Sequence, residues 1–157
     1  MRRTTLCYIE RDGAYLMLHR TKKKNDANHD KWLGVGGGVE AGETPDACLL
    51  REVREETGFA LTEYNKRGVI DFVSDRWEDE EMHIYTALAP NGVEPIPCDE
   101  GDLEWVAKEK IPALPLWEGD RIFLKLLAED APFFHLRLEY RGETLVRAIL
   151  NDTELSI

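Results

Sequence analysis

Apolar residues in the first part of the chain fall into two short runs, residues 4–10 and 14–20, that have the character of β-strands. Arg11-Asp12-Gly13 lies between them, and an Asp-Gly pair between two such runs is typical of a hairpin turn. Later segments with the same character predict further strands at residues 32–35, 67–74, 82–88 and 103–106. The segments that separate them are polar or contain Pro and Gly, which predicts loops at residues 21–31, 75–81 and 89–102.

The middle of the chain carries the signals of a helix. Thr44 is a good N-cap, Pro45 suits the first helical position, and Gly58 is typical just beyond a helix end. These signals predict a helix over residues 44–57. Because successive helical residues turn by about 100°, its apolar and acidic side chains lie on different arcs. The apolar arc holds Leu49, Leu50 and Val53, and the acidic arc holds Glu52, Glu55 and Glu56.

A second helix and a second hairpin are predicted in the last third of the chain. The helix begins at Trp117 or Glu118 and runs to Ala128. The hairpin consists of residues 133–140 and 144–150 around Arg141-Gly142-Glu143. This order of strands and helices predicts an α/β fold in which helices pack on a mixed sheet.

With 157 residues and a mass of 18.0 kDa, the chain is most simply one domain, residues 1–157, that is large enough for a hydrophobic core. Within this domain we place the main body of the fold in residues 1 to about 130 and a terminal hairpin at about 133–150. No apolar run approaches the roughly 20 residues of a membrane span, and residues 1–10 lack the apolar region of a signal peptide. We therefore expect no membrane partner.

Cysteine content and charge narrow the choice of compartment and partner. Cys7, Cys48 and Cys98 lack metal-site spacing, which favours free thiols and a cytoplasmic protein. The net charge of -11 argues against binding to a nucleic acid polymer, because phosphate contacts need clustered Lys and Arg. The basic run at residues 20–24, which includes Lys23, is either a solvated loop or a local attraction for a triphosphate tail. Both a monomer and a homodimer are compatible with this pattern.

The acidic arc of the first helix has an electrostatic cost. Glu52, Glu55 and Glu56 are surface neighbours, and like charges at this spacing destabilise an isolated helix by about 0.2–0.5 kcal/mol per pair. A solvated acidic face is one interpretation. A divalent cation is the other, because it would convert the repulsion into attraction, and carboxylate oxygens are the ligands that Mg2+ prefers. We favour a platform for Mg2+, with Mn2+ as the alternative, on which the glutamates converge.

Residues 37–59 read GGVEAGETPDACLLREVREETGF. They fit the pattern G-x5-E-x7-R-E-U-x-E-E-x-G-U, in which U is a bulky apolar residue. At roughly 6% usage per fixed residue, a chance match at one start point is on the order of one in 10^9. The segment resembles the signature of the Nudix hydrolases at every position. The resemblance implies the Nudix fold, an α/β/α sandwich around a mixed sheet, and hydrolysis of a phosphoanhydride bond.

The resemblance also implies a set of metal ligands. Glu52 and Glu56 would bind metal, and Glu55 would be shared between metal and water. The backbone carbonyl of Gly36 would be a further ligand. MutT-like members also supply a carboxylate from a later loop, for which Glu100 is the candidate, although Glu100 can equally be a solvated loop acid.

Two further residues of the signature would support the chemistry. By the same resemblance, Glu43 supports the metal shell and Arg51 orients the glutamates. The general base that takes the proton from water differs between members of the family. It stays open here between Glu52, Glu55 and a downstream acid.

The residues outside the signature point to the MutT-like branch that hydrolyses oxidised purine nucleoside triphosphates. Residues 117–120, Trp-Glu-Gly-Asp, are similar to a W-x-D-D motif in animal members, in which an aromatic ring stacks on the purine and an acid hydrogen-bonds its edge. By this comparison Trp117 and Asp120 bind the base, and Phe72 forms the floor of the pocket. The alternatives are a core anchor for Trp117 and a helix first-turn acid for Asp120.

Two positions depart from these relatives. By the same resemblance Leu33 belongs to the base-binding site, at a position where an asparagine can contact the base, and Gly38 stands where a lysine is common. Loss of the amide removes one contact that would select 8-oxoguanine.

The hypothesis is a Mg2+-dependent enzyme that converts a purine nucleoside triphosphate, oxidised forms such as 8-oxo-dGTP included, to the monophosphate and pyrophosphate. The alternatives are a Nudix hydrolase of another nucleoside diphosphate derivative, such as a nucleotide sugar or a dinucleoside polyphosphate, and a non-catalytic module that senses a nucleotide.

Overall fold

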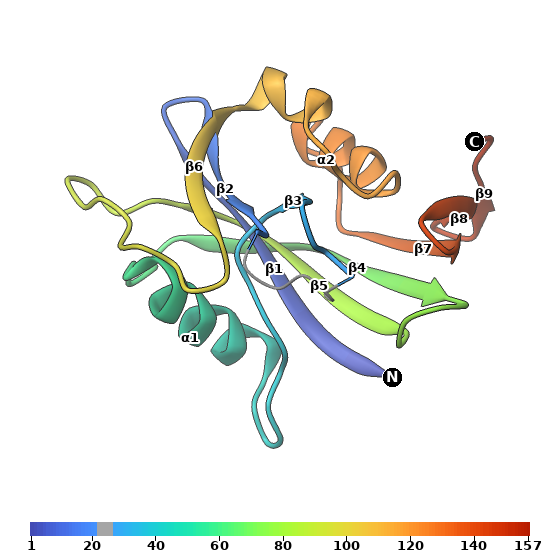
Figure 1. Ribbon diagram of the computed structural model, residues 1–157, viewed down its shortest axis with the longest axis horizontal. Helices are drawn as coiled ribbons and strands as arrows, with labels where there is room; N and C mark the ends of the chain where they lie inside the picture. Colours follow the sequence, from blue (N-terminus) through green and yellow to red (C-terminus); the bar gives the residue numbers. More distant parts are fainter. Residues whose placement is uncertain (22–26) are drawn as a thin grey trace.

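A mixed β-sheet is the centre of the computed structural model, which describes residues 1–21 and 27–157 (Figure 1). Within these residues the sheet has nine strands. They are β1 (Arg2–Arg11), β2 (Ala14–His19), β3 (Trp32–Leu33), β4 (Tyr64–Ser74), β5 (Glu80–Leu88), β6 (Asp102–Ala107), β7 (Phe134–Arg141), β8 (Thr144–Leu150) and β9 (Thr153–Glu154). The helices are α1 (Pro45–Thr57), the 3-10 helix η1 (Lys108–Ala113) and α2 (Asp120–Ala128).

The sheet order is β3-β2-β1-β5-β4-β7-β8-β9, with β6 paired to β2. Two of its pairings, β1 with β5 and β4 with β7, are parallel, and the others are antiparallel. The two α-helices, α1 and α2, lie on opposite sides of the sheet (Figure 1). This arrangement confirms the predicted α/β fold with a layer of helix on each face.

Each face of the sheet has its own core, because alternate residues of a strand point to opposite faces. On one face, Leu49 and Val53 of α1 are fully buried with Phe59. On the other face, Phe123 and Leu127 of α2 belong to a larger buried cluster that extends to the C-terminal strands. The apolar stripe predicted for the first helix is therefore the surface by which it packs, except that Leu50 is exposed.

The glycine-rich segment before α1, residues 34–38 with the sequence Gly-Val-Gly-Gly-Gly, is called the glycine run here, and a gap in the sheet determines its position. β1 and β2 pair only near their hairpin turn, where Ile9 lies opposite Leu16. Further along β1, residues 35–37 take the place of β2. Val35 N donates to Cys7 O at 2.9 Å, and Thr5 N donates to Gly37 O at 2.8 Å. The segment before α1 is thus held against the central strand of the sheet.

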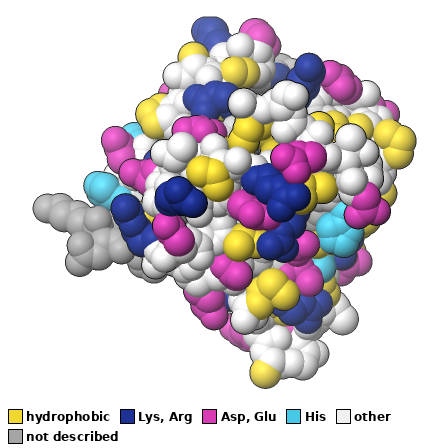
Figure 2. All heavy atoms as spheres, turned by 90° about the vertical axis from the view of Figure 1, so that its right-hand side faces the viewer, with side chains coloured by type: hydrophobic (Ala, Val, Ile, Leu, Met, Phe, Trp, Pro, Cys, Tyr) yellow, Lys and Arg dark blue, Asp and Glu magenta, His cyan; other side chains and the backbone are white. Residues whose placement is uncertain are grey.

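The terminal hairpin is part of the main sheet. Its first strand, β7, pairs in parallel with β4 from Gly68 to Ser74. β8 and β9 continue the same sheet as its last strands. Figure 2 faces the side of the molecule that carries these strands and shows acidic and basic side chains interspersed on it. Charged side chains on edge strands oppose pairing with other chains.

The structure differs from the sequence predictions at several element boundaries, and it adds two elements. β4 begins at Tyr64, earlier than predicted, because a bulge between Lys66 and Gly68 lets it stay paired with β5. α2 begins at Asp120, so Trp117 precedes the helix. The helix η1 and the short strand β9 have no counterpart among the predictions. None of the helices in the described residues has the length and apolar content needed to cross a membrane.

Candidate active site

Helix α1 has the ends that its sequence predicts. Thr44 Oγ1 accepts a hydrogen bond from Ala47 N at 3.1 Å, which caps the first turn. Gly58 has a φ of 80° and its N–H donates to Arg54 O, which ends the helix. Both caps come from residues next to the helix, so the rotational position of the glutamates was readable from the sequence.

Arg51 connects the acidic residues around the start of α1. Its Nε and Nη2 donate to the two carboxylate oxygens of Glu43 at 2.8 and 2.9 Å. Its Nη1 donates to Glu52 at 2.8 Å and to Glu55 at 3.4 Å, and its Nη2 also donates to Gly38 O at 3.1 Å. Hydrogen bonds from Arg51 lower the pKa of Glu43 to about 2. Arg51 therefore binds the glycine run and the helix carboxylates together.

Glu56 is the most deeply buried acid of the helix, with 7% of its surface exposed. Its Oε2 accepts a hydrogen bond from Gly36 N at 3.1 Å, whereas Oε1 has no hydrogen-bond partner among the described residues. Burial, together with the neighbouring carboxyl groups of Glu100 and Glu52, raises the pKa of Glu56 to about 9. A buried carboxyl beside two other acids is a place where a cation would be stabilised.

Two glycines of the run are required because other parts of the protein lie too close for a side chain. A Cβ atom on Gly36 would lie 1.9 Å from Thr5 O, because this residue pairs with β1. A Cβ atom on Gly37 would lie 2.4 Å from the carboxyl carbon of Glu52. Only glycine at these two positions allows the backbone, the sheet and the Glu52 carboxylate to meet.

Glu55 is oriented differently from the other two glutamates. Its side chain is 59% exposed and hydrogen-bonds Arg51. It does not line the cavity that Glu52 and Glu100 line. Glu55 therefore lies apart from the other two glutamates in this structure, and its role as a metal ligand stays a prediction. The third acid near Glu52 and Glu56 is Glu100, from a distant loop.

The donors present fit a hard divalent cation. They are carboxylate oxygens, and one of them, Glu56 Oε1, is buried without a partner among the described residues. In the described part of the chain, no three acidic, histidine or cysteine side chains already stand close enough to enclose an ion. Like charges repel when no cation lies between them, and Glu100 also pairs with Arg20 at 3.2 Å.

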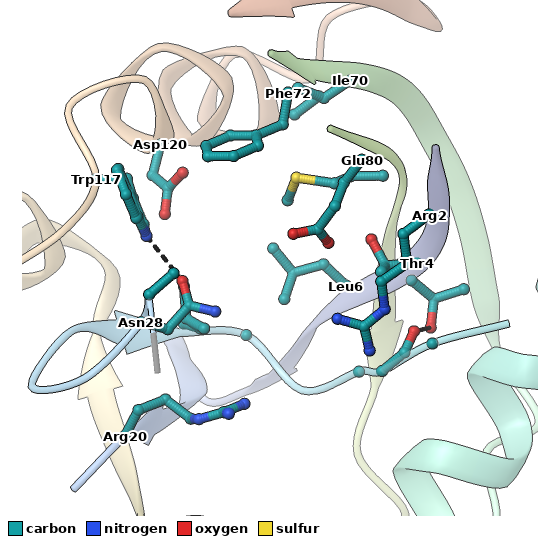
Figure 3. Close-up of a pocket in the computed structure, with 18 of the residues that line it drawn as sticks. Arg2, Thr4, Leu6, Arg20, Asn28, Ile70, Phe72, Glu80, Trp117 and Asp120 are labelled. Carbon is teal, nitrogen blue, oxygen red and sulfur yellow. Dashed lines mark hydrogen bonds between the residues drawn. The ribbon is translucent and has the colours of Figure 1, made fainter. Parts of the chain in front are cut away.

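One cavity of about 330 Å³ extends from these acids to the opposite helix layer (Figure 3). Its wall includes Glu52, Glu100 and the glycine run. It also includes the predicted base-binding residues Leu33, Phe72, Trp117 and Asp120. The structure thus brings together residues from the signature, from β4 and from the start of α2 around one space. Lys23, the predicted contact for the triphosphate tail, lies outside the described residues.

Trp117 is held by aromatic rings on several sides. Phe72, Trp77 and Tyr140 meet it edge to face, at 5.5, 5.4 and 5.0 Å between ring centroids. Trp117 Nε1 donates to Asn28 Oδ1 at 2.7 Å (Figure 3). The indole is 5% exposed, so the core role considered for Trp117 and a role in lining the cavity are both present in the geometry.

Asp120 points into the cavity (Figure 3) and is 6% exposed. Its Oδ2 has no hydrogen-bond partner among the described residues. Burial raises the pKa of Asp120 to about 7, although the charges of Arg121 and Lys31 oppose the rise. Near neutral pH the carboxyl can therefore either donate or accept a hydrogen bond.

Several lining residues were not identified from the sequence. Arg2, Thr4, Asn28, Trp77 and Glu80 all line the cavity. Asn28 and Trp77 belong to predicted loops, and Arg2, Thr4 and Glu80 lie near strand starts. Trp77 gave the one available signal, since a tryptophan in an otherwise polar loop is uncommon.

Comparisons with known proteins identify the family of this chain. The family model of the NUDIX domain matches residues 1–127. The chain is 31% identical over 131 residues to the oxidized purine nucleoside triphosphate hydrolase of Danio rerio, covering 82% of this chain and 81% of that protein. It is 30% identical over 135 residues to the nucleoside triphosphatase NudI of Escherichia coli (strain SE11), covering 79% and 95%.

The crystal structure of the MutT protein from Bacillus halodurans has the same fold, with a TM-score of 0.83 at 24% identity over 96% of this chain and 98% of that chain. Coverage this complete includes the terminal hairpin. The fold and the signature helix define a hydrolase of phosphoanhydride bonds. The chain belongs to the Nudix family, and its similarity within that family is to MutT-like proteins.

Proposed function

We propose that this protein hydrolyses purine nucleoside triphosphates to the monophosphate and pyrophosphate, with Mg2+ as cofactor. The observation that carries the proposal is that one and the same cavity is lined both by Glu52 and Glu100 and by Trp117 and Asp120. Carboxylates suit a cation that binds a phosphate chain, and an aromatic ring with a carboxyl suits a purine. The volume of the cavity, about 330 Å³, is within the range of small-molecule sites.

The cation would be held by Glu52, Glu56 and Glu100, with the carbonyl of Gly36 beside them. Glu55 stays a predicted ligand, and its carboxylate hydrogen-bonds Arg51 in this structure. When bound, the cation would neutralise charge on the phosphate oxygens and help to place water in line with the leaving group.

The chain itself supplies the proton acceptor and the alignment. Glu52 and Glu100 face the cavity, so either can take the proton from water as general base. Arg51 holds Glu52 through a hydrogen bond of 2.8 Å and so positions it without touching the substrate. Attack on the phosphate chain then releases the nucleoside monophosphate and pyrophosphate.

The base would be recognised by Trp117 and Asp120, with Phe72 behind them. A purine has a flat π face for the indole and donors and acceptors on its edge for the carboxyl. Leu33 offers no hydrogen bond, so we include unmodified purines with oxidised ones such as 8-oxo-dGTP as substrates. The similarity to a hydrolase of oxidized purine nucleoside triphosphates supports the oxidised substrates, and the similarity to a nucleoside triphosphatase supports triphosphates more generally.

The cytoplasm is the proposed compartment, because Cys7, Cys48 and Cys98 are free thiols. The proposed partner is a small nucleotide.

The test is a substrate panel in the presence of Mg2+: 8-oxo-dGTP, dGTP, ADP-ribose and diadenosine tetraphosphate, with products separated by ion-exchange chromatography. We expect the two triphosphates to have the highest kcat/KM and to release pyrophosphate. Inactivity on every triphosphate would contradict the proposal. Turnover of ADP-ribose or the dinucleotide alone would instead assign the protein to another substrate class of the same family.

A further inference from the structure

Resting on the proposed function, we infer that the C-terminal hairpin, β7–β8, positions the base-binding end of the cavity. The family model ends at residue 127, so this hairpin lies beyond the matched residues. Tyr140 and Glu143 of the hairpin act through the segment 117–120 and through Lys31. They are positioning residues that set the affinity for the nucleotide, whereas the phosphate chemistry belongs to α1 and Glu100.

The hairpin contacts three consecutive residues just before α2, residues 117–119. The ring of Tyr140 meets Trp117 at 5.0 Å between centroids. Leu145 N donates to Glu118 Oε2 at 3.2 Å, and Gly119 N donates to Tyr140 Oη at 2.7 Å. Every residue between the indole and Asp120 is therefore in contact with the hairpin.

Gly119 shows how close this contact is. A Cβ atom there would lie 2.5 Å from Leu138 Cδ1 and 2.7 Å from the Tyr140 hydroxyl oxygen. Leu138 also lines the cavity, so β7 forms part of its wall. The start of α2 can rest on β7 only because position 119 has no side chain.

Lys31 fixes the indole from another direction. Its Nζ lies 2.7 Å from Glu143 Oε1 and 5.0 Å from the Trp117 ring centroid. Asn28, from the same turn as Lys31, accepts the hydrogen bond of Trp117 Nε1. The hairpin and this turn hold the indole between them, and the ion pair of Lys31 with Glu143 joins the two.

The hairpin contacts involve the base-binding end of the cavity and do not involve the acidic residues of α1. Trp117 and Asp120 lie on or beside the clamped segment, whereas Glu52 and Glu56 lie on the helix of the opposite layer. An interaction that affects substrate and transition state equally changes KM and not kcat. Loosening the hairpin should therefore raise KM for nucleotides with little change in kcat.

The test compares Glu143→Gln and Tyr140→Phe with the matched control Glu139→Gln. Glu139 lies on the same hairpin, where it pairs with Arg137 at 2.8 Å and with Arg147 at 3.7 Å, and it does not line the cavity. We expect KM for dGTP to rise about twofold to fivefold in Glu143→Gln, the scale of one exposed ion pair. We expect a rise of about threefold to tenfold in Tyr140→Phe, the scale of one hydrogen bond.

In all three variants kcat should stay within about twofold of the wild type, and the control should keep the wild-type KM. Lys31→Arg keeps a positive charge beside the indole and beside Glu143, so it should also keep KM within about twofold. Lys31→Met removes that charge and should behave like Glu143→Gln. Melting temperatures, measured alongside, separate loss of stability from loss of affinity. An unchanged KM in both hairpin variants, or a fall in kcat at constant KM, would overturn the inference.

Failure of the proposed function is recognised separately. It appears in the wild type as absence of turnover on purine triphosphates. In that case the variants are compared on the nucleotide that the wild type does hydrolyse, because the hairpin contacts the segment 117–120 whichever base is bound. The same KM ratios are expected there, and their absence overturns the inference on its own.

Discussion

At the scale of single residues, Glu56 combines burial with two acidic neighbours. One of its oxygens is bound by the N–H of Gly36, and the other is buried with no partner in the described residues. A carboxyl in this position is costly for the folded protein unless a cation compensates it. We infer that the residue is retained for chemistry and not for stability.

Replacement of Glu56 by Gln tests this inference. Gln keeps the size and can still accept the Gly36 hydrogen bond, but it cannot ionise to bind a cation. We expect kcat to fall by at least about 10²-fold, the scale seen when an element of catalytic electrostatics is lost, while the circular dichroism spectrum stays unchanged. Glu63→Gln, at an exposed loop acid, is the control for loss of one carboxylate. Near-normal turnover in Glu56→Gln would refute the assigned role.

Asp120 makes stability depend on pH in a defined direction. Its pKa is about 7 in the folded protein, against an ordinary value of 3.8. The folded state thus holds the proton more tightly than the unfolded state, so this contribution is fully present below about pH 4 and is lost as pH rises through 7. The shift of Glu43, whose pKa is lowered to about 2, acts in the opposite direction below pH 4.5.

The comparison of Asp120→Asn with the wild type isolates this effect, because Glu43 contributes equally to both proteins. Between pH 4 and pH 8 the free energy of unfolding of the wild type should fall relative to the variant by on the order of 4 kcal/mol. Urea unfolding at several pH values measures it. Parallel curves for the two proteins across this range would show that Asp120 titrates normally.

At the scale of elements, α1 and the glycine run form one unit. The helix begins and ends where its caps predict, since capping depends on adjacent residues. The glycine run is held in position by hydrogen bonds to β1, and nothing in the sequence around the run predicts that pairing. Strand β7 is likewise placed by a long-range pairing, with β4. From the sequence, β7 and β8 have the pattern of an independent hairpin.

Gly37→Ala tests the contact between these two parts. The new Cβ atom would meet the flexible end of Glu52 and not backbone, so the protein should fold with Glu52 displaced. We expect kcat to fall about 10-fold to 100-fold, as misplacement by an ångström does in other active sites. Gly38→Ala is the matched control, because its Cβ atom would meet the guanidinium of Arg2 at 3.0 Å. Equal activity in the two variants would contradict the role of Gly37.

At the scale of the whole molecule, charge is the dominant property. The net charge of -11 repels a polyphosphate, so attraction must come from local cations. A bound divalent ion would serve the substrate and also relieve the repulsion among Glu52, Glu56 and Glu100. Stability and activity should therefore depend on the same ion.

Thermal unfolding in EDTA and in Mg2+ checks this dependence. A concentration of Mg2+ at 100 times its dissociation constant should stabilise the protein by about 2.7 kcal/mol and raise the melting temperature. Glu56→Gln should respond less. An equal rise in NaCl of matched ionic strength would show that general screening, and not a specific site, is responsible.

The sequence by itself determined the reaction class and the geometry of the signature helix. Caps and residue spacing are local properties, so the relative directions of Glu52, Glu55 and Glu56 follow from about 100° per residue. Even the choice of Trp117, Asp120 and Phe72 as cavity residues rested on short motifs that the fold did bring around one space.

Only the tertiary structure decided which acids share a space and which residues support them. Glu55 faces Arg51, whereas Glu100 reaches Glu56 from a distant loop, and the hairpin holds Trp117 through Tyr140 and Lys31. The physical reason is that burial, and with it the protonation of Glu56 and Asp120, depends on neighbours far away in the chain. A residue pattern does not contain those distances until the sheet has brought the segments together.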